Sequence, residues 1–140
     1  MAVSTSELVE KPARTTHRLR RASMKSLAPL GLTPAQERML RLVARVAEPA
    51  RMGELAERMG IVPRSATSLV AALEDAGLVA RMTDPENRRS VLVVLTDRGG
   101  DVQKSMVAAR ADAGQEMFAA LSADEREQLS TLLDKVGPAH

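Results

Sequence analysis

The shortage of aromatic side chains constrains the fold of this 140-residue chain more than any other feature. Phe118 is the sole aromatic residue, and Tyr and Trp are absent. The core must therefore consist of Leu, Val, Met and Ala, a set that favours packed helices over aromatic-rich sheets. A chain of this length usually forms one domain and can bury roughly two-thirds of its unfolded surface. We expect a single, mainly helical domain.

The residues that the chain lacks exclude several kinds of site. There is no cysteine, which excludes disulfides, thiolate metal ligands and cysteine nucleophiles. Only His17 and His140 could supply imidazole, so a histidine zinc site within one chain is not expected. No apolar run approaches the roughly 18 residues of a membrane span, and no signal peptide opens the chain. We expect a cytoplasmic protein without a metal, cofactor or membrane partner.

The net charge of +2 conceals an uneven distribution. Residues 1–50 hold nine basic and four acidic residues, whereas residues 99–140 hold four basic and seven acidic ones. The stretch 11–36 has no acid at all. Such a basic end indicates contact with an anionic polymer, although a solvated helix face in an arginine-rich chain explains it equally well.

Hydrophobic spacing and capping residues place most of the helices. Residues 1–12 are polar and end at Pro12, so we expect a flexible tail there. Thr33, Pro34 and Gln36 form a capping box with Pro at the first helical position. A second capping box begins at Ser122. The expected helices are 13–28, a helix that begins at Pro34 and ends before Pro49, 53–59, 63–76, 97–121 and one from 123 onward.

A β-hairpin is expected between the fourth and fifth of these helices. Residues 78–83 and 90–96 are short runs, the second rich in Val and Leu, and polar turn residues at 84–87 join them. The long helix after the hairpin and the last helix carry more apolar side chains than one small domain can cover. These are Val102, Met106, Ala109, Ala113, Met117, Leu129, Leu132 and Leu133. We therefore expect a two-fold homodimer built from the terminal helices.

The spacing of Ala56, Gly60 and Ala66 carries the functional signal. A helix–turn–helix needs a small residue where its helices cross, favours Gly in the turn, and buries an apolar residue of the second helix. The hairpin that follows completes the order of a winged helix–turn–helix, which binds double-stranded DNA. Its second helix exposes the candidate base and phosphate contacts Pro63, Arg64, Ser65, Thr67 and Ser68.

Arg88 and Arg89 follow the turn of the hairpin and are candidates for phosphate or minor-groove contacts. A solvated hairpin tip is the alternative explanation for Arg88 and Arg89, and ordinary polarity of a helix N-terminus is the alternative for Ser65, Thr67 and Ser68. For Arg81, a structural salt bridge is at least as plausible as a DNA contact. No catalytic residues are predicted, because Gly99-Gly100 lacks the following Lys-Ser/Thr of a phosphate loop and the adjacent acids of Glu74-Asp75 face different directions.

The chain resembles the MarR family of bacterial transcription regulators. The matching segments are LAPLGLTPAQ (27–36), ELAERMG (54–60), LVAALEDAGLVAR (69–81) and DPENRRSVLVVLTDRG (84–99). The resemblance implies a winged helix–turn–helix at 33–96, flanked by dimerisation helices at 13–32 and 97–140 within one domain, 13–140. It also implies a homodimeric repressor on a pseudo-palindromic operator.

Many members of the family release DNA on binding phenolic or aromatic acids. In this chain an effector is expected between the dimer helices and the DNA-binding lobe, in an aliphatic pocket where Arg18 and Arg21 hold a carboxylate. Three features depart from the family pattern. Pro12 and the short polar start indicate a first helix shorter than usual. Ser68 replaces a frequent Arg, and Asn87 replaces an Asp that would brace the wing arginines. A protein-interaction module and a sequence-indifferent architectural DNA binder remain the alternative functions.

Overall fold

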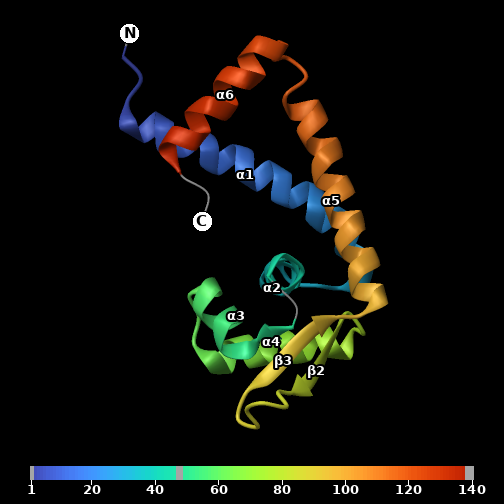
Figure 1. The fold of residues 1–140 in the computed structure, drawn as a ribbon. Helices are drawn as coiled ribbons and strands as arrows, with labels where there is room; N and C mark the ends of the chain where they lie inside the picture. Colours follow the sequence, from blue (N-terminus) through green and yellow to red (C-terminus); the bar gives the residue numbers. More distant parts are fainter. Residues whose placement is uncertain (1, 47–48, 138–140) are drawn as a thin grey trace.

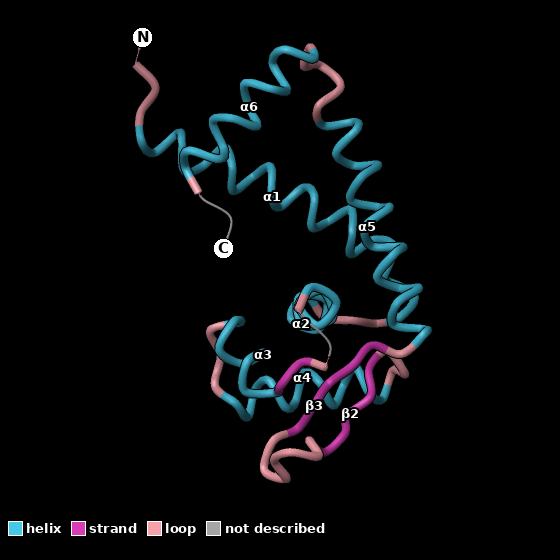
Figure 2. Tube along the Cα trace, viewed as in Figure 1, coloured by secondary structure: helices cyan, strands magenta, loops and turns pink. Residues whose placement is uncertain are grey.

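The computed structural model describes residues 2–46 and 49–137, and it is mainly helical with one small sheet (Figures 1 and 2). Helices α1, α5 and α6 form one side of the molecule, and the elements from α2 to β3 form a lobe below them. The elements are α1 Thr5–Leu27, the 3-10 helix η1 Ala28–Leu30, α2 Pro34–Arg45, β1 Ala50–Arg51, α3 Met52–Met59, α4 Pro63–Asp75, β2 Val79–Thr83, β3 Val91–Leu95, α5 Asp97–Met117 and α6 Ala123–Val136.

The first helix is longer than the sequence indicated, and the expected tail at 1–12 is wrong from Thr5 onward. Ser4 and Glu7 form a capping box, in which the Ser4 hydroxyl accepts from the Glu7 N–H at 3.2 Å and Glu7 accepts from the Ser4 N–H at 3.0 Å. Pro12 lies inside the helix. Its ring removes one backbone donor but leaves the turns on both sides helical. Met1 lies outside the described residues.

The two other capping boxes are confirmed. Thr33 accepts from the Gln36 N–H at 3.2 Å and opens α2, and Ser122 accepts from the Glu125 N–H at 3.1 Å and opens α6. The end of each element is less predictable. Helix α2 ends at Arg45, before Pro49, and α5 ends at Met117 rather than at Leu121, because residues 118–121 form turns.

The helix–turn–helix is confirmed in its details. Ala56 and Ala66 are buried where α3 and α4 pack together, and Gly60 ends α3 in the left-handed conformation with φ 66°. A residue with a Cβ is strained in that conformation, which explains the glycine. The core that holds this unit is aliphatic and centres on Met39, Leu40, Val43, Leu55, Val70, Leu73, Leu78, Val93 and Met106.

The hairpin is confirmed and has a third strand that the sequence did not indicate. Strands β2 and β3 pair antiparallel with Arg81 opposite Val93, and β1 pairs with the other edge of β3 through Ala50 opposite Val93. The strand order is β1-β3-β2. A strand of two residues is too short to show an alternating hydrophobic pattern in the sequence. Strand β1 is therefore recognised only from its pairing with β3 in the structure.

Helix α5 joins the lobe to the terminal helices. Thr96 caps its start, because its hydroxyl accepts from the Gly99 N–H at 3.0 Å and donates to the Gly77 carbonyl at 2.6 Å. Met106 is buried against the core, and α1 packs along α5. Helix α6 turns back toward the N-terminal half of α1 and buries none of its residues.

Candidate DNA-binding surface

The N-terminal half of α4 presents a polar surface to solvent. Pro63, Arg64, Ser65, Thr67 and Ser68 are all exposed, as the sequence predicted. The Thr67 hydroxyl donates to the Pro63 carbonyl at 3.0 Å, and the Ser68 hydroxyl donates to the Arg64 carbonyl at 3.1 Å. These two hydroxyl groups therefore lie close to the helix backbone, and Arg64 is the only one of the five residues with a long, charged side chain. No carboxylate among the described residues is in ion-pair distance of Arg64.

The loop between β2 and β3 is held in a defined shape by two side chains. Asp84 is buried, and its Oδ1 accepts from the Glu86 N–H at 2.9 Å, while its Oδ2 lies 3.6 Å from Arg51 Nη2 on β1. Asn87 Oδ1 accepts from the Arg89 N–H at 3.1 Å. The loop thus has a carboxylate brace at Asp84, and Asn87 braces the backbone of the arginines rather than their guanidinium groups.

Sequence reasoning missed the role of Asp84 and Arg51. Asp84 was interpreted only as a turn residue, and Arg51 lies on the strand that the sequence did not reveal. Arg88 and Arg89 follow this braced loop, and both are exposed. Within residues 2–46 and 49–137, neither guanidinium forms an ion pair, so the loop displays two uncompensated positive charges.

Arg81 has a structural partner. Its Nη2 lies 3.0 Å from Glu74 Oε1 on α4, and its backbone N–H donates to Glu74 Oε2 at 3.1 Å. This double attachment joins the end of α4 to β2. The hydrogen bonds from the Arg81 side chain, and then from its backbone, lower the pKa of Glu74.

Replacing Glu74 by an uncharged residue should lower the free energy of unfolding only at a pH at which the Glu74 carboxylate is ionised. A carboxylate whose pKa is lowered by folding stabilises the native state above the unfolded pKa of about 4.3, and this contribution disappears as the pH falls through the folded value. Glu74→Gln should therefore unfold at a lower urea concentration than the parent at pH 7, with a small difference because the pair is solvated. The two midpoints should converge as the pH falls below the folded pKa of Glu74; an undiminished difference in acid would show that the charge is not the cause.

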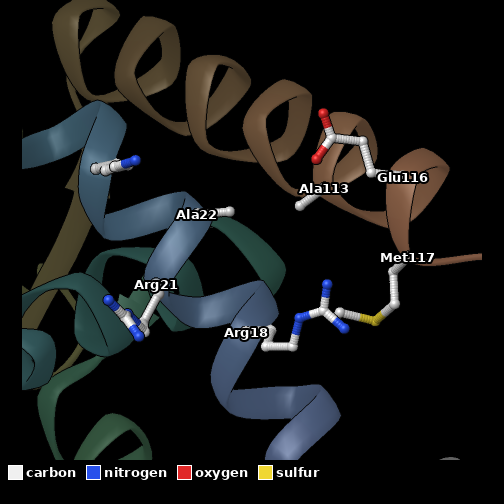
Figure 3. Close-up of a pocket in the computed structure, with 7 residues that line it drawn as sticks. Arg18, Arg21, Ala22, Ala113, Glu116 and Met117 are labelled. Carbon is white, nitrogen blue, oxygen red and sulfur yellow. The ribbon is translucent and has the colours of Figure 1, made fainter.

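A hollow of about 330 Å³ lies between α1 and α5 and includes both arginines proposed for an effector. Its lining is Arg18, Arg21, Ala22, Lys25, Ala113, Glu116 and Met117. Figure 3 shows Arg18 extending toward Met117, whereas the Arg21 guanidinium points away from Met117. The hollow thus lies between two terminal helices, not at their junction with the lower lobe where the sequence placed it.

Comparisons with known proteins identify the class to which this winged helix–turn–helix belongs. The model of the MarR family matches residues 32–91. An HTH-type transcriptional repressor of Mycobacterium tuberculosis is 31% identical over 112 residues, covering 80% of each chain. An uncharacterized HTH-type transcriptional regulator of Bacillus subtilis is 31% identical over 107 residues, covering 76% of this chain and 69% of the relative.

Solved structures of MarR-type proteins support the same family assignment. Apo MarR from E. coli superposes with a TM-score of 0.79 at 28% identity, covering 99% of both chains. CouR from Rhodococcus jostii, solved with bound p-coumaroyl-CoA, superposes with a TM-score of 0.67 at 28% identity, covering 91% of this chain and 90% of CouR. The chain belongs to the MarR family, and it is a DNA-binding transcriptional regulator. In the part of the chain that the structure describes, no helix is long and apolar enough to span a membrane.

Proposed function

We propose that the protein is a homodimeric repressor that binds a pseudo-palindromic operator through α4 and the loop between β2 and β3. The observation that carries this proposal is the exposed, unpaired set of Arg64, Arg88 and Arg89 on the helix and loop that a winged helix–turn–helix presents to DNA. Helix α4 would enter the major groove, and the loop would contact phosphates or the minor groove. Such a protein is a regulator rather than an enzyme, and in a bacterial cell it acts in the cytoplasm.

Arg64 is the residue best placed to read a base. A guanidinium that forms two hydrogen bonds with guanine contributes about 1–3 kcal/mol of discrimination. Arg64→Ala should therefore weaken operator binding by that amount and leave binding to random DNA nearly unchanged. Fluorescence anisotropy with both DNAs measures the difference. An equal loss on both would assign Arg64 to a phosphate, and specificity would then rest on the shape of the DNA.

The exposed apolar side chains support a homodimer, and they agree with the sequence prediction only in part, since Leu132 and Leu133 are exposed whereas other members of the predicted stripe are not. Met106 is buried within the chain, and Val102 packs against the core. On the terminal helices, the uncovered residues are Leu132, Leu133 and Val136 of α6, which are 57%, 53% and 84% exposed, Val107 of α5, which is 57% exposed, and Leu8 and Val9 of α1. A monomer gains little from leaving such side chains in water, whereas a second copy can cover them.

Sedimentation of the full chain at micromolar concentration should therefore give the mass of a dimer. Replacing Leu132 and Leu133 by Ser should shift it toward the monomer, because both side chains lie on the helix that buries nothing within its own chain. In the dimer, the two copies of α4 would meet half-sites about 10 bp or a multiple of that apart. A parent protein that sediments as a monomer would refute the two-fold arrangement.

An effector that carries a carboxylate and an apolar body fits the hollow between α1 and α5. Arg18 and Lys25 supply positive charge, and Met117 and Ala113 supply apolar surface. The acyl coenzyme A bound by CouR supports an anionic, partly apolar effector for this chain also. Release of the operator by aromatic carboxylates, and loss of that release in Arg18→Ala, would test the idea.

A further inference from the structure

Four arginines surround a second hollow on the lower lobe, away from the residues assigned to DNA. Arg38, Arg41 and Arg45 come from α2 and Arg58 comes from α3, while Leu42 and Met59 complete the lining. We call this the α2–α3 arginine hollow. Its volume is about 210 Å³, below the roughly 300–1,000 Å³ typical of a site that encloses a whole small molecule.

Positive charge in this hollow exceeds the negative charge around it. Arg58 Nε lies 3.1 Å from Glu54 Oε1, and Arg41 Nη1 lies 3.8 Å from the buried Glu37 Oε1. Arg38 and Arg45 are exposed, and neither pairs with a carboxylate anywhere in the described chain. Among the described residues, therefore, no carboxylate neutralises these two guanidinium groups, and both can bind an anion.

The surroundings of Arg41 add to the imbalance. Its side chain is only 18% exposed, and burial is the main reason that the pKa of Arg41 is lowered. Glu37 opposes this effect, whereas Arg110 on α5, Arg20 on α1 and Arg45 reinforce it. Like charges held close together in a partly buried place destabilise the free protein, and a bound anion would relieve that repulsion.

The position of the hollow distinguishes it from the DNA-binding surface. Helix α2 lies between α1 and α4 (Figure 2), and Arg41 interacts with charges on α1 and α5. None of the residues that line the hollow belongs to α4 or to the loop between β2 and β3, so the hollow shares no residue with the DNA-binding surface.

We propose that the α2–α3 arginine hollow binds the phosphate groups of a small phosphorylated metabolite. Guanidinium forks match phosphate oxygens in paired hydrogen bonds, and two uncompensated arginines match the charge of a phosphate dianion. The small volume holds the phosphate part alone, so the rest of the ligand would extend out of the hollow into solvent. This site goes beyond operator binding and does not depend on it.

Thermal unfolding with inorganic pyrophosphate tests the proposal in the full chain. The parent Tm should rise by about 3–6 °C when pyrophosphate is at ten times its Kd, compared with sodium chloride of equal ionic strength. The double variant Arg38→Gln/Arg45→Gln should lose this shift. It should also be at least as stable as the parent without pyrophosphate, because the repulsion of Arg41 by Arg45 has been removed; a purely structural pair of arginines would instead lower the Tm.

The matched control is Arg88→Gln/Arg89→Gln, which removes the same charge from the loop between β2 and β3 and should keep the full pyrophosphate shift. Operator binding, measured separately, should be retained by Arg38→Gln/Arg45→Gln. No saturable shift in the parent, or an equal shift in both double variants, would overturn the site. A loss of operator affinity in Arg38→Gln/Arg45→Gln without any pyrophosphate effect would assign the hollow to the DNA backbone and overturn it as well. Failure of the parent to bind an operator would count against the proposed function alone.

Discussion

Replacing Arg88 and Arg89 together by alanine is expected to reduce the salt dependence of DNA binding more than any other double substitution in the lobe. Each phosphate that a protein neutralises adds about 0.9 to the slope of log affinity against log salt concentration. If each arginine contacts one phosphate, the slope falls by up to about 2 for each loop and about 4 for the dimer. The affinities for operator and random DNA should fall together, because phosphates carry no sequence information.

The structure supplies the reason to expect so large an effect. Asp84 and Asn87 fix the loop through the backbone, and neither takes up the charge of the arginines. Arg81 on the same hairpin is a matched control, because Glu74 already pairs with it. Arg81→Ala should leave the slope nearly unchanged. If the double variant keeps the parent slope and remains dimeric, the loop does not contact DNA, and the protein-interaction alternative becomes the better account.

The second large expected effect is a loss of stability when Gly99, near the start of α5, is replaced by alanine. A Cβ added to Gly99 would overlap the carbonyl oxygen of Leu78 and lie 2.9 Å from its carbonyl carbon. That oxygen cannot move freely, because it accepts from the Thr96 N–H at 3.1 Å. Gly99→Ala should therefore destabilise the fold by about 2–4 kcal/mol, the range of a severe overpacking.

Gly100 is the control for this substitution. It lies next to Gly99 in the same helix, and nothing lies within 4 Å of a Cβ built on it. Gly100→Ala should be neutral or stabilising by up to about 1 kcal/mol, because alanine lowers the entropy of the unfolded chain. Urea unfolding of both variants at one protein concentration gives the comparison. Equal stability of the two would show that the contact between Leu78 and α5 adapts without cost.

Local signals explain most of what the sequence predicted correctly. The capping boxes at Thr33 and Ser122 depend on residues three apart, and the chain itself brings such residues together. The spacing of Ala56, Gly60 and Ala66 likewise describes a local unit, and the structure confirms it. The tail was wrong because Pro12 was interpreted as a limit of the helix and the capping box of Ser4 and Glu7 was not recognised. A single proline within a long helix is tolerated when the turns on either side remain intact.

The features that the sequence did not reveal depend on distant segments. The pairing of Ala50 with Val93 and the ion pair of Arg51 with Asp84 require β1 to meet β3 across the lobe. The α2–α3 arginine hollow requires two helices to cross with their arginines on one side. The spacing of Arg38, Arg41 and Arg45 indicates one helix face, but no sequence pattern indicates that Arg58 joins it. The exposure of Arg88 and Arg89 was predictable because it follows from a polar turn.

Binding of the dimer to the DNA upstream of its own gene, compared with a shuffled duplex of the same composition, tests the central claim most directly. Anisotropy titrations at several salt concentrations should show steep salt dependence on both duplexes and an affinity at least about 10³-fold higher for the upstream DNA near physiological salt. Equal affinities would make the protein an architectural binder. No binding to either duplex at low salt would contradict a DNA-binding role for α4 and the loop between β2 and β3.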